Sequence, residues 1–542
     1  MNRLLYILLI LFTSYFSQIN LCFAQRWEIL HGNQNVEEEF MDFQEFYDNG
    51  YLVTGGILDE DMNKWGVWVI KTDINGNTLW DKKIIHNNSN NIAILSCTSD
   101  KSGEVYMSGS IYLSVFGFWP LIIKFDSCGE KIWCRYFYTD QFIGGVFRDN
   151  LILDNNDILS LAYFSSDNYI RQIFIICFDE NGNLKWMQPY ATQYDHPEIG
   201  LAFGRELLKN QNSYYITGYC YWPYPENPHV WWLRPFFIGI DSLFNEKWIL
   251  PFGVSDSIVG EAMGVLPLSE SEYLGYGKCF PDAKSNDLTQ ALLMRFNNNG
   301  EEKGYCMIDR DEINPPTNYN LIQKVVAIND TLFMASANFG PLYQGNPNGE
   351  YIFDLNGHIY QYQSHPSTDW KSKVIKTFDN KYVFCTDINE SGNPQYSDIL
   401  LYKLNANLEQ DTVYTGNYMY DSLCPYQIQS GIIDISDCDM TVNIKEIPSP
   451  KEYYASLKTI LVKVFPNPGK KQVTLQFENT QYHTNILLQC FDLLGRELHE
   501  EKVYPYQGAS IVDVSGWNDG MYMAVVTGNG RVVGRCKFIV RR

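Results

Sequence analysis

The sequence lacks most of the short motifs that mark enzyme active sites. It has no HExxH, no H-x-H, no G-x-S-x-G, no phosphate loop and no dinucleotide fingerprint. Runs of carboxylates at residues 37–39 and 59–61 are typical of solvated turns. We interpret all eight histidines as surface or core residues without a catalytic role: His31, His86, His196, His229, His358, His365, His483 and His499. We therefore predict no catalytic residues and no cofactor, and favour a non-enzymatic protein over an enzyme.

Cysteine pairs of the kind that bind metals are also absent. Apart from Cys22, the cysteines are scattered singly with no CxxC pair, which argues against zinc and iron–sulfur sites. Cys128 and Cys134 flank a predicted hairpin turn, and Cys424 and Cys438 bracket a loop, so both pairs are candidate disulfides in an oxidising compartment. The sequence leaves the connectivity open, and the other eight cysteines are equally well explained as small buried apolar residues.

Positive charge is scarce. The chain has 41 Lys and Arg against 63 Asp and Glu, a formal net charge of -22. Residues 451–542 contain 12 Lys or Arg and 8 Asp or Glu, a net +4, which leaves -26 for the first 450 residues. An acidic body of this kind repels phosphate backbones, so we predict that nucleic acid is not a partner.

Long hydrophobic runs are absent beyond the first 24 residues. Arg3, an apolar run from Leu4 to Phe12, and Ala24 before Gln25 form the pattern of a secretory signal peptide, predicted over residues 1–24. Polar residues interrupt the run well short of the ~20 apolar residues that a membrane span needs. Leucine before Cys22 disfavours a lipid-anchored start. We predict an exported protein with no stable membrane span.

An internal repeat is the most informative feature. In its strongest copies, such as KTDINGNTLW at residues 71–80, an apolar run ends in Asp, Gly follows three positions later and Trp seven positions later. The anchor residues are Asp73, Asp126, Asp179, Asp241, Asn297, Asp354 and Asn405. The tryptophans are Trp80, Trp133, Trp186 and Trp248. Spacings of 53, 53, 62, 56, 57 and 51 residues indicate a repeat architecture.

Each repeat has the strands and turns of a propeller blade. Three further β-rich runs accompany the Trp-bearing run, and four antiparallel strands per repeat are typical of a β-propeller. In D-x-N-G, Asp accepts backbone amides and Gly takes the positive-φ position of a tight hairpin turn. The Trp of the next strand is then placed to pack between successive blades. A calcium loop would need a distal bidentate Glu, which is missing, so we predict no metal site.

The two ends of the ring are predicted to meet. Residues 26–29 (RWEI) resemble a Trp-bearing outer strand with no blade before it, whereas the last repeat, near Thr412, lacks its Trp. The orphan strand would complete the last blade and close the ring, leaving only short protected edges. We predict an all-β protein with seven blades over residues 25–440. Six or eight blades stay open because the last two copies are degraded.

Aromatic residues gather in the loops between the second and third strands of the blades, on one face of a propeller. The blade-four insertion YWPYPENPHVWW (residues 221–232) lengthens that repeat to 62 residues. Flat rings and rigid prolines would form a platform for sugar rings or partner side chains, whereas capping of the blade core is the alternative. The candidate ligand-binding residues are Trp119, Tyr221, Trp222, Tyr224, Trp231 and Trp232. Similar loops contain Trp65, Phe116, Phe118 and Tyr343.

A different module follows the repeats. The Pro-Ser-Pro at residues 448–450 indicates a linker over residues 441–458. Short strand patterns alternate with turns over residues 459–542, which is typical of a small β-sandwich.

The motifs of this module carry a family resemblance. VFPNPGKKQVTLQF, FDLLGRELHE, GMY and the closing RCKFIV resemble the type A C-terminal sorting domain of type IX secretion cargo. The corresponding motif residues are Pro466, Asn467, Pro468, Gly495, Gly520, Tyr522 and Lys537. The resemblance implies export, recognition of this domain by the type IX machinery at the outer membrane, and its removal with release or attachment to a surface lipopolysaccharide. The repeats loosely resemble bacterial quinoprotein-like and delta-60-like propeller repeats, from which no quinone cofactor follows.

These observations favour an extracellular or surface propeller that binds a glycan or another macromolecule through its aromatic loops. Two alternatives stay open. A polysaccharide-acting enzyme would need carboxylates in the propeller channel, and convergent Asp or Glu pairs there would favour it. A structural or adhesive surface protein would have no small ligand.

Overall fold

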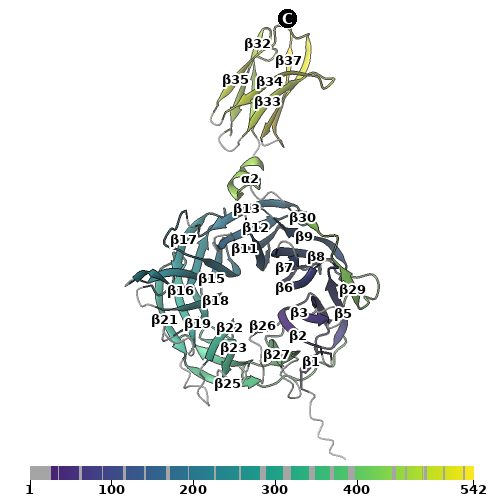
Figure 1. The fold of residues 1–542 in the computed structure, drawn as a ribbon. Helices are drawn as coiled ribbons and strands as arrows, with labels where there is room; N and C mark the ends of the chain where they lie inside the picture. The colour runs from purple at the N-terminus through teal and green to yellow at the C-terminus, as the bar shows by residue number, and fades with distance from the viewer. Residues whose placement is uncertain are drawn as a thin grey trace, which may run out of the picture.

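The computed structural model is an all-β protein in which seven four-stranded blades surround a channel and a small β-sandwich follows (Figure 1). It describes residues 26–542 except 34–35, 60–63, 88, 114–116, 139–141, 166–170, 193, 225–226, 255–257, 281–288, 309–318, 341–347, 366–370, 389–396, 442–446, 458–459, 479, 481–484, 505–506 and 529–530. The predicted signal peptide, Phe116 and Tyr343 lie outside these residues.

The strands of blades 1 to 6 run in sequence order from the channel to the rim. Blades 1 to 3 consist of β2 (Glu38–Glu45), β3 (Tyr51–Asp59), β4 (Lys64–Thr72), β5 (Thr78–Ile85), β6 (Ser89–Ser99), β7 (Val105–Leu113), β8 (Gly117–Phe125), β9 (Lys131–Phe137), β10 (Gly144–Ile152), β11 (Ile158–Ser165), β12 (Arg171–Phe178) and β13 (Leu184–Tyr190). Blades 4 to 6 consist of β14 (Ala202–Asn210), β15 (Ser213–Tyr224), β16 (Asn227–Ile240), β17 (Glu246–Pro251), β18 (Gly260–Pro267), β19 (Glu272–Cys279), β20 (Gln290–Asn297), β21 (Glu302–Ile308), β22 (Tyr319–Ala327), β23 (Leu332–Gly340), β24 (Asn348–Asp354) and β25 (Ile359–His365).

The seventh blade joins the two ends of the ring, as predicted. It contains β26 (Ser372–Lys376), β27 (Tyr382–Ile388) and β28 (Asp398–Leu404), and its outer strand is the N-terminal β1 (Glu28–His31), antiparallel to β28. Trp27 is fully buried and donates its indole N–H to the Ile74 carbonyl at 2.8 Å. Trp27 thereby supplies the tryptophan that the seventh repeat lacks.

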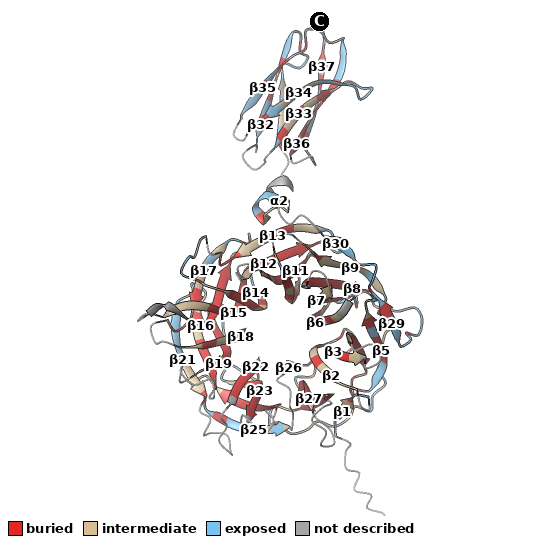
Figure 2. Ribbon diagram, viewed as in Figure 1, coloured by how far each residue is buried: buried red, intermediate tan, exposed pale blue. Residues whose placement is uncertain are grey.

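The repeat motif links each blade to the next. In the turn of blade 2, Asp126 Oδ1 accepts the amides of Cys128 and Glu130 at 2.9 and 2.8 Å. Gly129 has a φ of 69° and lies against the ring of Trp80, where an added Cβ would meet the indole at 3.0 Å. The tight turn therefore provides a flat seat for the tryptophan of the preceding blade, which excludes water from the cleft between blades. Buried residues accordingly run through every blade (Figure 2).

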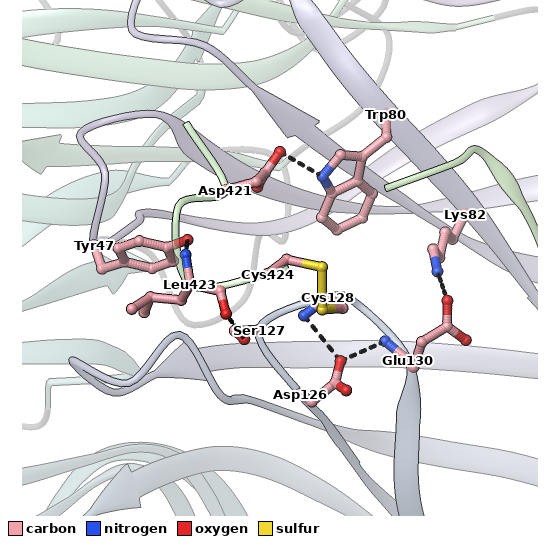
Figure 3. Close-up of a disulfide and its surroundings, with 10 residues drawn as sticks. All are labelled: Tyr47, Trp80, Lys82, Asp126, Ser127, Cys128, Glu130, Asp421, Leu423 and Cys424. Atoms are coloured by element: carbon pink, nitrogen blue, oxygen red, sulfur yellow. Dashed lines mark hydrogen bonds and ion pairs between the residues drawn. A yellow bond between two sulfur atoms is a disulfide. The ribbon is translucent and has the colours of Figure 1, made fainter. Parts of the chain in front are cut away.

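A strap follows the seventh blade and crosses the outer edges of blades 1 and 2. We use this name for residues 412–441, which contain β29 (Gly431–Asp434), parallel to β5, and β30 (Asp439–Thr441), parallel to β9. Two disulfides fix the strap to blade 2: Cys128–Cys424 (Figure 3) and Cys134–Cys438. Our expectation of the local pairs Cys128–Cys134 and Cys424–Cys438 is therefore wrong. Cys128 and Cys134 each bond to a cysteine of the strap instead of to one another across the hairpin.

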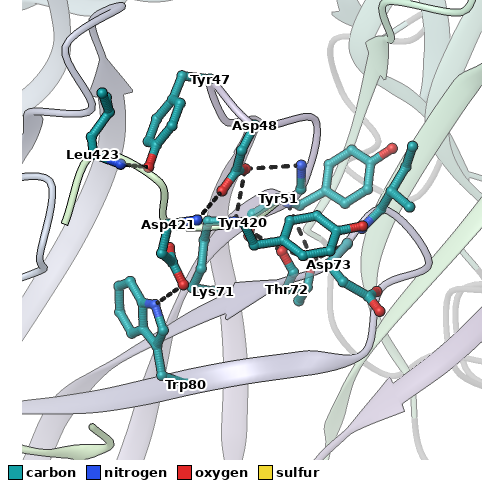
Figure 4. A network of polar contacts seen from close by, with 12 residues as sticks. Tyr47, Asp48, Tyr51, Lys71, Thr72, Asp73, Trp80, Tyr420, Asp421 and Leu423 are labelled. Carbon is teal, nitrogen blue, oxygen red and sulfur yellow. Dashed lines mark hydrogen bonds and ion pairs between the residues drawn. The ribbon is translucent and has the colours of Figure 1, made fainter. Parts of the chain in front are cut away.

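A buried polar network holds the strap against blade 1 (Figure 4). Lys71 Nζ lies 2.9 Å from Asp48 Oδ1, and both side chains are almost fully buried. The other oxygen of Asp48 accepts the amide of Asp421 at 3.0 Å, and Asp421 Oδ2 accepts the indole N–H of Trp80 at 3.1 Å. The Lys71 ammonium also lies over the ring of Tyr420 of the strap at 5.5 Å. Since both aspartates and this lysine contact groups across the seam, the strap is part of the propeller core and not a loose tail.

The segment predicted as a linker contains a helix. In α2 (Pro450–Leu457), Ser449 Oγ accepts the amide of Glu452 at 3.3 Å, and the Glu452 carboxylate accepts the amide of Ser449 at 2.9 Å. This reciprocal pair is a capping box. Lys185 of β13 lies over the ring of Tyr453 at 5.2 Å, so the helix packs on the rim of blade 3.

Beyond α2, two sheets pack face to face around an apolar core. One has the order β31 (Leu461–Phe465), β32 (Gln472–Glu478) and β35 (Ala509–Asp513). The other has the order β34 (Glu497–Val503), β33 (Ile486–Phe491), β36 (Gly520–Gly528) and β37 (Arg531–Val540). This arrangement is the small β-sandwich that the sequence predicts.

Candidate functional site

The innermost strands of six blades carry a β-bulge at equivalent positions. A bulge adds one residue to one strand of a pair and re-aims the side chains around it. The bulged residues are Met41, Leu95, Arg148, Arg205, Met263 and Gln323. All six side chains line a cavity of about 200 Å³ in the channel. Lys371, Ser372 and Lys373 of blade 7 complete the ring of residues around it.

The cavity is richer in cations than in carboxylates, although the protein as a whole is acidic. Its charged lining residues are Arg148, Arg205, Lys324, Lys371 and Lys373 against Asp42, Asp149 and Glu206. Four of the cations are paired: Arg205 with Glu261 at 2.6 Å, Lys373 with Asp42 at 2.5 Å, Lys324 with Glu206, and Lys371 with Glu39.

Arg148 is the exception. Among the described residues it has neither a hydrogen-bond partner nor an ion-pair partner for its guanidinium. Burial and the neighbouring charge of Arg205 lower the pKa of Arg148, and Tyr163 and Tyr219 also lie within electrostatic range of it. A guanidinium carries five N–H donors. This one is therefore available to an acceptor that enters the cavity.

The three carboxylates of the cavity bind backbone amides of the next blade. Asp42 accepts a hydrogen bond from the amide of Cys97 at 2.8 Å. Asp149 accepts one from the amide of Leu207 at 2.8 Å. Glu206 accepts one from the amide of Val265 at 3.0 Å. Burial and the charge of Glu206 raise the pKa of Asp149 to about 6. Each carboxylate thus connects two blades at the bulges.

Gly264 of blade 5 gives the Glu206 carboxylate the space that it needs to reach the next blade. An added Cβ at Gly264 would lie 2.4 Å from Oε2 of Glu206 and 2.2 Å from the hydroxyl of Tyr276. Only a residue without a side chain leaves room for the Glu206 carboxylate to reach the amide of Val265.

Aromatic rings and arginines meet beside the cavity, at the end of the channel where the second and third strands of blades 3 and 4 are joined. The rings of Phe203 and Tyr219 are stacked with centroids 4.3 Å apart, and Tyr163 meets Phe203 edge-on at 5.6 Å. Arg171 lies over Phe203 at 4.0 Å and Arg205 over Tyr219 at 5.4 Å. We call Arg148, Tyr163, Arg171, Phe203, Arg205 and Tyr219 the channel cluster.

The blade-four insertion is a long hairpin and not an irregular loop. Strands β15 and β16 pair up to Tyr224 and Asn227, with Trp222 opposite Trp232 and Pro223 opposite Trp231. Because side chains alternate along a strand, Tyr221 and Trp231 share the face that carries Tyr219, whereas Trp222 and Trp232 lie on the other face. The candidate aromatic residues therefore do not form one platform.

The exposure of these rings differs widely. Trp231 is 43% exposed, Tyr221, Trp222 and Trp232 are half-buried, and Trp222 packs against the core between blades 3 and 4. Trp119 is 1% exposed and lies edge-on to Tyr138 within the core of blades 1 and 2, so its ring cannot contact a ligand. The side chain of Tyr224 lies outside the described residues.

The opposite end of the channel has the opposite charge. There, the turns of blades 1 to 3 surround a cavity of about 860 Å³ with five carboxylates, Glu45, Asp100, Glu104, Asp154 and Glu180, and with Lys101 as the one lysine among the described lining residues. The channel is therefore electrostatically polar, with its cations at the end that carries the channel cluster.

The arginines of the cluster were not among the residues predicted from the sequence. The only signal was the recurrence of a charged pair, Arg148-Asp149 and Arg205-Glu206, at the same position of successive first strands. A bulge is a property of the pairing between two strands, and no residue type specifies it.

The sorting-motif residues lie in the turns and strand ends of the sandwich. Asn467, between Pro466 and Pro468, accepts the amide of Ile539 at 2.8 Å through its side chain, which ties this turn to the last strand. Gly495 takes a φ of 79° in the turn after β33.

The remaining motif residues lie on the last two strands. Gly520 begins β36, and the buried Tyr522 donates its hydroxyl to the Asn518 carbonyl at 2.7 Å. Lys537 is exposed on β37.

Several solved structures are similar to this chain. An ulvan lyase of polysaccharide lyase family PL25 is 9% identical, with a TM-score of 0.42, over 68% of this chain and 94% of that one. The β-propeller domain of the trilobed protease from Pyrococcus furiosus is 10% identical, with a TM-score of 0.39, over 70% and 97%. Trypanosoma rangeli sialidase is 10% identical, with a TM-score of 0.37, over 95% and 92%. At these identities and TM-scores the likenesses bear on neither the ligand nor the chemistry of this chain.

A comparison with curated proteins finds no match. Within the described part of the chain, no helix has the length and apolar character needed to cross a membrane. Residues 463–541 match the family described as the secretion system C-terminal sorting domain, which covers the motif residues named above. The protein is therefore a cargo of the type IX secretion system, a β-propeller with a C-terminal sorting domain that is exported to the cell surface or the extracellular space.

Proposed function

We propose that the exported propeller (residues 25–440) is a saccharide-binding protein and that the channel cluster is its binding site. The observation that carries this proposal is the meeting of the partly exposed rings of Tyr163 and Tyr219 with arginines at one end of the channel, around the buried ring of Phe203. Saccharides are bound by aromatic ring surfaces together with side chains that donate and accept hydrogen bonds. In the cluster the two tyrosines supply the partly exposed ring surface, and the arginines supply the donors. Residues 441–458 would connect this unit to the sorting domain (residues 459–542).

The face of blade 4 extends the same surface outward. Tyr219, Tyr221 and Trp231 follow one another on one face of the β15–β16 hairpin, and Trp231 and Tyr221 lie close to Gly200, where an added Cβ would meet their side chains at 2.9 and 3.1 Å. The hairpin rings would then contact sugar units beyond the one held at the channel. Trp222 and Trp232 would have no part in this contact.

Binding without turnover is favoured over enzymatic cleavage because the channel carboxylates are already engaged. Asp42, Asp149 and Glu206 each accept an amide of the next blade, and two of them also pair with a lysine. A general acid or base must reach the substrate with a free oxygen. These groups would have to leave their structural partners to do so.

A saccharide array probed with the full mature chain tests the proposal. Tyr219→Leu keeps apolar volume but removes the flat ring, and we expect it to weaken binding about tenfold or more. Phe118→Leu, on an exposed aromatic residue of blade 2, is the matched control and should change binding less than about twofold. Equal affinities of the two variants, or no binding to any saccharide, would contradict the proposal. Release of shortened saccharides by the wild-type protein would support an enzyme instead.

A further inference from the structure

Resting on the proposed function, we infer that the bound saccharide is acidic and that its carboxylate or sulfate group contacts the guanidinium of Arg148. Arg148 is a bulged residue of β10 and lines the cavity. Unlike the other cations of the cavity, it has no carboxylate within hydrogen-bond or ion-pair distance among the described residues, although the charge of the adjacent Asp149 acts on it. Its neighbours Arg205, Tyr163 and Tyr219 belong to the same cluster.

The chemistry of the group favours an anion over a neutral hydroxyl. A guanidinium presents its N–H donors as a planar fork that matches the two oxygens of a carboxylate or the oxygens of a sulfate. In a partly enclosed cavity such a pair is stronger than at the fully exposed surface. A neutral sugar would satisfy the donors singly and would leave the positive charge unpaired.

The dimensions and polarity of the channel define how the ligand enters. A cavity of about 200 Å³ holds about seven water molecules at roughly 30 Å³ each, which suits one sugar unit and not a threaded chain. The acidic cavity at the far end would repel a polyanion. The ligand would therefore insert one acidic unit from the end of the channel cluster.

Because the whole protein is negatively charged, its preference for an acidic ligand can come only from short-range contacts in the cavity. At -22 the whole chain repels anions at a distance. Affinity for an acidic saccharide would then come from direct contact at Arg148 and would increase at moderate salt, which screens the long-range repulsion before it weakens a partly buried pair.

Titration calorimetry of the full chain with three matched oligosaccharides tests this inference. The three differ only in one position: a neutral hydroxyl, a carboxylate or a sulfate. We expect Arg148→Met to weaken binding of one or both acidic ligands by about tenfold to a hundredfold, the effect of losing hydrogen bonds to a charged group, and to leave the neutral ligand within about twofold. Arg295→Met removes a half-exposed arginine that pairs with Glu272, away from the cavity, and is the matched control. Arg148→Lys should retain part of the affinity.

The outcomes separate the inference from the proposed function. If the wild-type protein binds the neutral and acidic ligands equally, or if Arg148→Met leaves acidic binding unchanged, the inference is overturned while saccharide binding stands. If no saccharide binds, both are overturned. Should Arg148→Met fail to fold, the preference of the wild-type protein for the acidic ligands, measured at two salt concentrations, decides the same question. The carboxylate and sulfate ligands show which of the two groups is preferred.

Discussion

The two strap disulfides close nearly the same loop, so their removal should lower the free energy of unfolding in a non-additive way. Cys128–Cys424 joins residues 296 positions apart, and Cys134–Cys438 joins residues 304 apart. With loop closure entropy as the only contribution, closing a loop of about 300 residues stabilises the fold by about 5 to 6 kcal/mol. Once one bridge exists, the second closes a ring of only about 20 residues and adds about 3 kcal/mol.

The two pairs are therefore expected to be strongly non-additive. Replacement of Cys134 and Cys438 by Ser, with the first bridge intact, should lower the free energy of unfolding by about 3 kcal/mol, and so should replacement of Cys128 and Cys424 alone. Replacement of all four should lower it by about 9 kcal/mol, a loss comparable with the whole stability of a typical domain.

Equilibrium urea unfolding followed by tryptophan fluorescence measures these losses, with Cys306→Ser, at a partly buried free cysteine, as the control. If the two single-pair losses summed to the loss of the quadruple variant, the bridges would act independently and the shared-loop reasoning would be refuted. Mass spectrometry of non-reduced peptides checks the connectivity itself. A linked Cys128–Cys134 peptide would refute the reasoning at its first step.

Three further predictions concern the core and its charges. Lys71→Met should lower the free energy of unfolding, measured in urea, by about 3 to 5 kcal/mol because it leaves the Asp48 carboxylate buried without its cation. An unchanged free energy of unfolding would show that water solvates this pair. Trp186→Ala, at a fully buried ring, should cost about 3 to 5 kcal/mol, whereas Trp231→Ala, at a 43% exposed ring, should stay within about 0.5 kcal/mol. Equal losses would contradict the assigned burial. Burial lowers the pKa of His31 from 6.5 to about 4, so the unfolded chain takes up the proton first as the pH falls. Stability from this residue is complete above pH 6.5 and is lost towards pH 4, by about 2 kcal/mol at pH 5; His31→Asn should reduce the difference in stability between pH 7.5 and pH 5, and an unchanged difference would contradict the shift.

The blades could be predicted because their signals are local. In the three strongest copies the Asp, Gly and Trp lie within eight residues of one another, and each residue has a direct physical role in the turn or in the cleft to the next blade. Ring closure could be predicted from the same kind of signal. The N-terminal run with Trp27 resembles an outer strand that has no blade of its own, and the seventh repeat lacks an outer strand with which to complete its blade.

The strap and the site could not be predicted in the same way. Cys128 and Cys134 lie close in the sequence, but their partners arrive from about 300 residues away along the strap. Arg148 and Arg205 acquire their role from bulges in the strand register. The aromatic insertion of blade 4 was visible, yet its pairing as a hairpin divides Trp222 and Trp231 between two faces.

The most direct test of the central claim, that the channel cluster binds a saccharide, is a crystal structure of the full chain with an acidic oligosaccharide. We expect one sugar unit beside Tyr219 with its anionic group within hydrogen-bond distance of Arg148. A ligand bound only on the outer hairpin at Trp231 or Trp232, with the channel cavity empty of sugar, would contradict the claim.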